Sequence, residues 1–222
     1  MKKQFLILFL FASASSFAQV RIGALAGGNL MTQSFSKLED GGDVSSIPAY
    51  HVGVLFSVPI SKNISFQPGL NYQLKGSQLS EPERTTASLV VVNLNLTTYA
   101  KTEFELHYLE LPVNISLAAE AGRFKVTPYL GLYAACAMSG KVSITNAVTG
   151  MTAEESPVKF GRGDDFQRID YGGQLGVGLE IDKLFFRLQY SLGLANISGR
   201  DNNTVKNHGL GLSVGYWIHN IK

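Results

Sequence analysis

Residues 64–75 read Ile-Ser-Phe-Gln-Pro-Gly-Leu-Asn-Tyr-Gln-Leu-Lys, so apolar residues alternate with small or polar residues through this stretch. In a β-strand successive side chains point to opposite faces, and the alternation predicts one apolar face and one polar face. Seven further stretches of the chain follow the same pattern. Because a sheet crosses a bilayer without unpaired backbone groups only when it closes on itself, the pattern predicts a barrel if the apolar face meets lipid.

The connections between these stretches alternate in length. Short turns are expected at 60–62, 119–121 and 182–183, and long connections at 30–48, 77–102, 141–168 and 198–206. Short turns on one rim and long loops on the other are typical of outer-membrane barrels, whose short turns lie in the periplasm. The eight predicted strands span 20–29, 49–59, 63–76, 103–118, 122–140, 169–181, 184–197 and 207–218.

Composition excludes several classes of protein. Charged residues make up 16% of the chain, below the quarter or so that is usual for soluble domains. A net charge of +2 is too small to indicate a nucleic-acid partner. Cys136 is the single cysteine, which excludes a domain held together by internal disulfides. We expect Cys136 to be a small residue on the lipid-facing side of its strand.

The first eighteen residues are predicted to be a cleaved signal peptide. Lys2 and Lys3 precede an apolar run over 5–12, and Ser16-Phe17-Ala18 supplies the small residues that a signal peptidase reads. The apolar run is shorter than the roughly 20 residues of a spanning helix. We therefore expect export, with 19–222 forming one barrel domain in the outer membrane.

The polar faces of the strands distinguish a membrane barrel from a soluble one. A soluble lipocalin-like barrel would turn its apolar set inward and expose many Lys, Glu and Thr side chains. The polar sets here are mostly Gly and Ser, as in 172–180 and 211–215. Small residues suit the narrow lumen of an eight-stranded barrel, which has room only for its own side chains. The sequence therefore predicts an all-β, eight-stranded antiparallel up-and-down transmembrane β-barrel with long extracellular loops.

Aromatic residues gather near the predicted strand ends. Rings at the two headgroup depths are typical of membrane barrels, so we expect two belts on the outer surface. The short-turn belt is predicted to contain Phe66, Phe124, Phe185, Tyr216 and Trp217, and the long-loop belt Tyr50, Tyr72, Phe104, Tyr108 and Tyr171.

Six charged residues fall on the inward parity of their strands. Since an isolated buried ion is costly, we expect them to form a network of ion pairs and hydrogen bonds that fills the lumen. A conducting or substrate-binding lumen is the alternative. The pairing of each Glu with a base depends on strand tilt and shear, which the sequence leaves open. The predicted network contains Arg21, Lys75, Glu110, Lys125, Glu180 and Arg187.

No catalytic, metal-binding or cofactor-binding residues are predicted. An acyl hydrolase needs a nucleophile, a histidine and an orienting acid, and His208 with nearby Ser198 and Asp201 is the first set to consider. No nucleophile-elbow sequence accompanies them. The acidic pairs at 154–155 and 164–165 do not follow the spacing of a calcium loop.

The second long connection has unusually high β-propensity. It contains Leu89-Val90-Val91-Val92 followed by Asn93-Leu94-Asn95-Leu96. We expect the flanking strands to continue above the membrane as a hairpin, whose exposed edge could capture a partner by strand addition. A self-contained hairpin without a partner is the alternative. The candidate docking residues are Val90, Val92, Leu94 and Leu96.

Several ordered stretches make the chain resemble the PorT-like outer-membrane β-barrels of Bacteroidetes, a family of small porin-like barrels. The resemblance implies an outer-membrane barrel, and one branch of that family is linked to secretion across the outer membrane. The stretches that carry it are 23–29, 67–72 with Lys75-Gly76, 108–112, 128–131, 170–172, 189–194 and Lys206-Asn207.

The leading functional hypothesis is a monomeric, non-enzymatic barrel with a side-chain-filled lumen. It would contact membrane lipids and act through its extracellular loops in envelope structure, adhesion or docking to a protein. A narrow channel for ions or small solutes and a lipid-modifying enzyme are the alternatives.

Overall fold

The computed structural model describes residues 20–37, 42–89, 92–146, 152–200 and 203–221, and within these the side chains outside 81–100, 146–153 and 219–221. The predicted signal peptide lies outside these residues. No helix in these segments has the length and apolarity needed to cross a bilayer. The strands are β1 (Val20–Phe35), β2 (Asp43–Ser45), β3 (Ile47–Pro59), β4 (Ile64–Leu89), β5 (Val92–Leu117), β6 (Ala119–Ala121), β7 (Phe124–Asn146), β8 (Thr152–Pro157), β9 (Ile169–Ile181), β10 (Leu184–Gly193) and β11 (Val205–Ile221).

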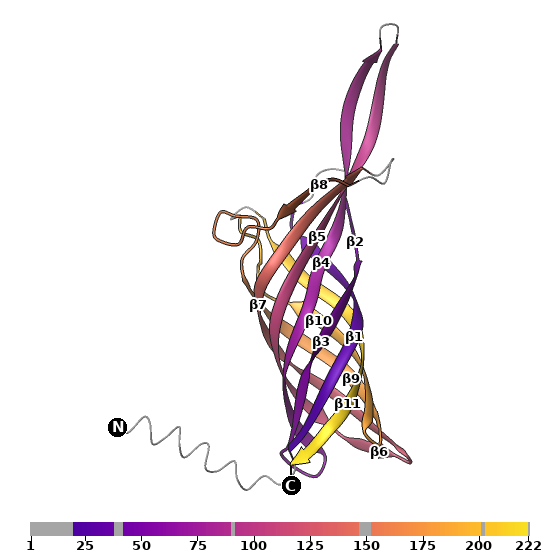
Figure 1. Cartoon of the computed structure of the whole chain (residues 1–222), viewed down its shortest axis with the longest axis vertical. Helices are drawn as coiled ribbons and strands as arrows, with labels where there is room; N and C mark the ends of the chain where they lie inside the picture. The colour runs from indigo at the N-terminus through magenta and orange to yellow at the C-terminus, as the bar shows by residue number, and fades with distance from the viewer. Residues whose placement is uncertain (1–19, 38–41, 90–91, 147–151, 201–202, 222) are drawn as a thin grey trace, which may run out of the picture.

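Eight of these strands form a closed antiparallel ring (Figure 1). The order around the ring is β1, β3, β4, β5, β7, β9, β10 and β11, and β11 pairs with β1 to close it. The predicted eight-stranded barrel is therefore confirmed. The short strands β2, β6 and β8, which the alternation did not predict, extend the edges of β4 and β7.

The two ends of the barrel differ as predicted. One end carries the short turns, the beginning of β1 and the end of β11. Asp182 in the two-residue turn between β9 and β10 has a φ of 55°, in the left-handed region that tight hairpin turns use. At the other end, β4 and β5 continue as one hairpin, paired out to Leu89 and Val92, that projects beyond the rest of the molecule (Figure 1).

The outer surface of the ring is apolar. Leu130, Leu132 and Leu212 are more than 60% exposed, and their inward neighbours on the same strands are buried or half-buried. An apolar band of this kind around a barrel is the surface that lipid covers. Cys136 shares the outward parity of Leu130 and Leu132, as expected.

Leu74 departs from the alternation that begins at Ile64. It is buried, in a cluster with Met31, Ile47 and Ala49. Pairing between β3 and β4 ends at His51–Gln73, and pairing of β4 resumes with β2 at Ser45–Gln78. The five residues 46–50 thus face the four residues 74–77, so the strands are irregular beside Leu74.

The prediction of aromatic belts is partly wrong. Tyr50, Tyr72, Tyr171, Phe124 and Tyr216 are exposed on the outer surface. Tyr108, Phe185 and Trp217 are instead buried in the lumen, and Phe104 packs against the buried cluster around Tyr108. Their strand neighbours point outward, so the period-two alternation places these rings inside.

Candidate functional site

A lysine between two carboxylates occupies the part of the lumen nearest the long loops. This part is called the upper lumen below, and the part nearest the short turns is called the lower lumen. Lys75 Nζ lies 2.8 Å from Glu110 Oε2 and 3.0 Å from Asp170 Oδ2. The three side chains, from β4, β5 and β9, are at most 1% exposed. The Gln73 amide also donates a hydrogen bond to Glu110. Mutual pairing and hydrogen bonds thus hold the charges, as buried ions require, although Glu110 Oε1 has no hydrogen-bond partner among the described residues.

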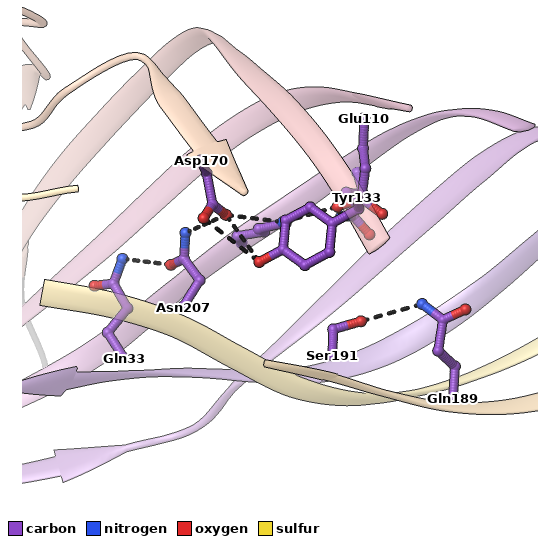
Figure 2. A network of polar contacts seen from close by, with 9 residues as sticks. Gln33, Glu110, Tyr133, Asp170, Gln189, Ser191 and Asn207 are labelled. Carbon is purple, nitrogen blue, oxygen red and sulfur yellow. Dashed lines mark hydrogen bonds and ion pairs between the residues drawn. The ribbon is translucent and has the colours of Figure 1, made fainter. Parts of the chain in front are cut away.

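A chain of hydrogen bonds continues from Asp170 across the lumen (Figure 2). Asn207 Nδ2 donates to Asp170 Oδ2 at 3.1 Å, and Gln33 Nε2 donates to Asn207 Oδ1 at 2.9 Å. Ser77 Oγ in turn donates to Gln33 Oε1 at 2.9 Å. These groups come from β1, β4, β9 and β11, so the chain ties together strands that are not all neighbours in the ring.

Two tyrosine rings complete the surroundings of Lys75. Its ammonium lies 4.0 Å from the centre of the Tyr133 ring and 5.2 Å from that of Tyr108. The Tyr133 hydroxyl donates to Asp170 at 3.3 Å. A cation over an aromatic face gains further stabilisation when it is desolvated.

The middle of the lumen is polar. Arg187 lies 3.9 Å over the Tyr129 ring, and its guanidinium donates to Gln67 Oε1 at 3.5 Å. His51 Nε2 is 2.7 Å from Ser213 Oγ, and Gln174 Nε2 donates to Asn114 Oδ1 at 2.8 Å. A cavity of about 30 Å³ separates these groups, room for about one or two water molecules.

Aromatic and basic side chains fill the lower part of the lumen. Phe185 and Trp217 are in ring contact, with centres 4.7 Å apart, and they cluster with Leu25 and Leu55. Arg21 stacks over the Trp217 ring at 4.0 Å. Its guanidinium also forms an ion pair with Glu180 at 2.8 Å.

Two long connections cover the upper end of the lumen. Val158, Phe166 and Ile197 are buried against Leu106 and Tyr133 of the barrel wall. The two connections bind each other through the backbone: Gln167 donates to Ile197 at 2.8 Å and Gly163 to Gly199 at 2.7 Å. Apolar loop residues therefore cover the long-loop end of the lumen, above the ion-pair network.

An exposed ion-pair cluster lies outside the lumen, where β7 meets β8. Lys141 Nζ is 3.3 Å from Glu155 Oε1 and 3.5 Å from Glu105 Oε2. A hydrogen bond to Glu155 and the charges of both carboxylates raise the pKa of Lys141. Since all three side chains are solvated, the cluster contributes little to stability.

The six predicted lumen residues occupy different surroundings. The structure pairs Lys75 with Glu110 and Arg21 with Glu180, and it buries Arg187 against Tyr129. Lys125 lies at the short-turn mouth, and no described side chain forms an ion pair with it. Asp170 was missed, although inward parity counted from Gly172 and Gln174 includes it.

The described side chains do not form the Ser–His–Asp triad that the catalytic alternative requires. The Ser198 hydroxyl donates to the Arg200 carbonyl at 3.0 Å and accepts from the Arg200 amide at 3.2 Å. His208 is half-buried on the outward parity of β11, and Asp201 lies outside the described residues. Within the same residues no group of three or more His, Cys, Asp or Glu side chains is arranged to hold a metal ion.

The candidate docking hairpin is described only as backbone. Val92, Leu94 and Leu96 lie in β5, opposite Leu89, Ala87 and Thr85 of β4. Val90 lies outside the described residues. The expected continuation of the strands above the barrel is confirmed by this pairing.

Several solved bacterial proteins are similar to this chain at low sequence identity. Similar solved structures include Neisserial surface protein A (NspA), at 12% identity and TM-score 0.45, with 89% of this chain and 97% of that chain covered. Ail of Yersinia pestis matches at 11% identity and TM-score 0.35, with 90% and 99% covered. LpxR from Salmonella typhimurium matches at 7% identity and TM-score 0.31, with 89% and 100% covered.

The sequence itself has no significant match among curated proteins. A family model described as "Outer membrane protein beta-barrel domain" matches residues 11–199. That match covers most of the chain, and the closed ring with its apolar exterior agrees with it. The chain therefore belongs to the outer-membrane protein β-barrel family and resides in the outer membrane.

Proposed function

We propose that this protein is a non-enzymatic barrel with a closed lumen that works through its extracellular side, docking other polypeptides at the cell surface. The observation that carries the proposal is the filling of the lumen. The Phe185–Trp217 contact, the Lys75 network and the apolar cover around Phe166 lie at three successive levels. Because described side chains fill the lumen at each of these levels, the proposal assigns the function to the loops and the hairpin.

The β4–β5 hairpin is the docking element in this proposal. Each strand has 26 residues, whereas about 9–11 suffice to cross a bilayer. Beyond Ser80 of β4 and Ala100 of β5, the described strands pair only with each other. Both outer edges thus offer backbone N–H and C=O groups, the chemistry that an extended peptide uses for strand addition.

Proline and alanine scanning of β5, combined with crosslinking in cells, tests this role. Successive N–H groups of a strand point to opposite sides, so of two neighbouring residues one faces the free edge. A photocrosslinker placed in 85–97 should capture a partner polypeptide. One of the two variants Leu94→Pro and Asn95→Pro should abolish this capture, because one of the two N–H groups faces the free edge. Leu94→Ala and Asn95→Ala, which keep the backbone donor, should retain it. Capture that both prolines leave unchanged would contradict strand addition to the β5 edge.

Catalysis is outside this proposal, and lipid chemistry tests that part. We expect His208→Ala and Ser198→Ala to leave the lipid composition of the outer membrane unchanged, since Ser198 is engaged by backbone groups. Loss of a lipid product in either variant, with the barrel still folded, would support an enzyme instead.

The finer family position belongs to the same proposal. The ordered stretches that resemble PorT-like barrels support membership of that family. If the chain shares the secretion role of one branch, deleting its gene should stop export of proteins that carry a C-terminal secretion signal. Unchanged export would place the chain outside the secretion-linked branch and leave the docking role to be tested by the hairpin variants.

A further inference from the structure

A cleft of about 500 Å³ opens at the short-turn end of the barrel. Its lining comes from the beginning of β1, the β6–β7 and β9–β10 turns and the end of β11. Trp217 and the Arg21–Glu180 ion pair contribute to its buried part. A volume of this size is within the range of small-molecule sites, about 300–1,000 Å³. The cleft shares Arg21, Glu180 and Trp217 with the lower end of the lumen and lies at the opposite end of the barrel from the hairpin (Figure 1).

Positive charge in the cleft is incompletely paired. Arg21 is bound to Glu180, but Arg123, Lys125 and Lys183 have no ion-pair partner among the side chains that the structure describes. Lys125 is half-buried and lies opposite Glu120 and Glu180 in the strand pairing, but no ion pair joins it to either carboxylate among the described side chains. Four cations and three carboxylates (Glu120, Glu180 and Asp182) line the cleft. One bound anionic group would therefore bring the net charge of the lining to zero.

Trp217, which lines the cleft, carries a buried hydrogen-bond donor. Trp217 is 3% exposed, and its indole Nε1 has no hydrogen-bond partner in the described part of the chain. An indole N–H can only donate. Lysine and arginine side chains also only donate, so the basic part of the lining favours a ligand that presents acceptor oxygens, as a phosphate does.

Two apolar residues place the opening of the cleft at the lipid surface. Phe124 and Ile218 line the cleft and are 46% and 60% exposed on the outer face of the barrel. A ligand in the cleft can therefore contact the basic side chains and the apolar band at the same time. The short turns of outer-membrane barrels lie in the periplasm, so this opening faces the inner leaflet.

We infer that the short-turn cleft binds the phosphate-bearing headgroup of a phospholipid from the periplasmic leaflet. Lys125, Arg123 and Lys183 hold the phosphate oxygens, and Phe124 and Ile218 contact the beginning of the acyl chains. The rim carboxylates Glu120 and Asp182 suit a headgroup that also carries an ammonium group. This inference does not depend on the docking role of the hairpin.

Trp217 provides the readout because it is the single tryptophan of the chain. The full chain, refolded in maltoside micelles, is titrated with dihexanoyl phosphatidylethanolamine, dihexanoyl phosphatidylglycerol, inorganic phosphate and dihexanoylglycerol. We expect a saturable change in Trp217 emission with the phospholipids, a change only at higher concentration with phosphate, and none with dihexanoylglycerol.

Charge-removing variants locate the site. Lys125→Gln and Lys183→Gln should each raise the half-saturating phospholipid concentration about threefold to fivefold, as loss of one partly solvated charge contact does. Lys101→Gln, the same change at the opposite end of the barrel, should leave it unchanged. Lys183 lies in an exposed turn, so its variant keeps the test valid if Lys125→Gln does not fold.

Three results would overturn the inference. They are the absence of a saturable signal, an equal response to dihexanoylglycerol, and equal binding by the two cleft variants and wild type. Inorganic phosphate that binds as tightly as the phospholipids would exclude the lipid as the source and leave a site for free phosphate.

Discussion

Lys75 Nζ lies 3.0 Å from Asp170 Oδ2, although the two residues are 95 positions apart and their strands, β4 and β9, are separated in the ring by β5 and β7. The ion pair therefore crosses the lumen instead of joining adjacent strands. Glu110 on β5 binds the same ammonium at 2.8 Å. One lysine thus connects three parts of the barrel wall, and its removal should affect the whole barrel.

Lys75→Met should destabilise the folded barrel strongly. The substitution leaves two fully buried carboxylates without their cation, and breaking a buried pair from one side costs about 3–5 kcal/mol. Urea unfolding in lipid vesicles, followed by the heat-modifiable gel mobility of the folded barrel, measures the change. A difference below about 0.5 kcal/mol, the usual range of surface substitutions, would show that the network does not hold the barrel together.

Arg21→Met should cost less than Lys75→Met. The Arg21 side chain is 22% exposed and lies at the mouth, so water can replace part of its contact with Glu180. We expect a loss of roughly 1–2 kcal/mol in the same unfolding assay, between a solvated pair and a fully buried one. The opposite order of the two variants would contradict the burial seen at these sites.

Gly215→Ala should be far more harmful than Gly28→Ala. A Cβ at Gly215 would overlap the Phe185 ring in the lower lumen, whereas a Cβ at Gly28 meets nothing closer than the Ala49 carbonyl oxygen at 3.9 Å. Overpacking a filled core costs about 1–3 kcal/mol, so Gly215→Ala should lower the urea midpoint and Gly28→Ala should leave it nearly unchanged. Equal midpoints would indicate that the lower lumen has space to spare.

Cys136, the single cysteine, tests which face meets lipid. It lies on the outward parity of β7, and the next residue, Ala137, is 1% exposed inside the barrel. A membrane-soluble maleimide should label Cys136 in lipid vesicles. It should not label Ala137→Cys in a Cys136→Ala background. Labelling of the second variant with the barrel still folded would indicate an accessible lumen.

The alternation in the sequence predicted the fold because each face of a membrane barrel has one solvent. Lipid selects residues such as Leu130 and Leu212, and the lumen selects small and polar ones such as Gly178 and Ser213. The same parity would have placed Phe185 and Trp217 inside, since Phe186 and Tyr216 point outward. The prediction of aromatic belts placed these rings outside against their parity, and it was wrong for them.

The sequence does not predict which lumen side chains pair with each other, and the reason is geometric. Lys75 meets Asp170 across the barrel, and that meeting depends on shear and tilt, which period-two patterns do not contain. Asp170 was missed because it stands at the beginning of its strand. The cover formed by Phe166 and Ile197 belongs to irregular loops, where no periodicity indicates which side chains turn inward.

Current through single barrels tests the closed lumen most directly. Purified full-length protein is inserted into planar bilayers in symmetrical potassium chloride, and the insertion is confirmed by the folded gel mobility of the recovered protein. We predict no steady open-state current, because rings, ion pairs and loop residues fill the lumen at three levels. Reproducible, long-lived current steps from the wild-type protein would contradict the account and favour a narrow channel.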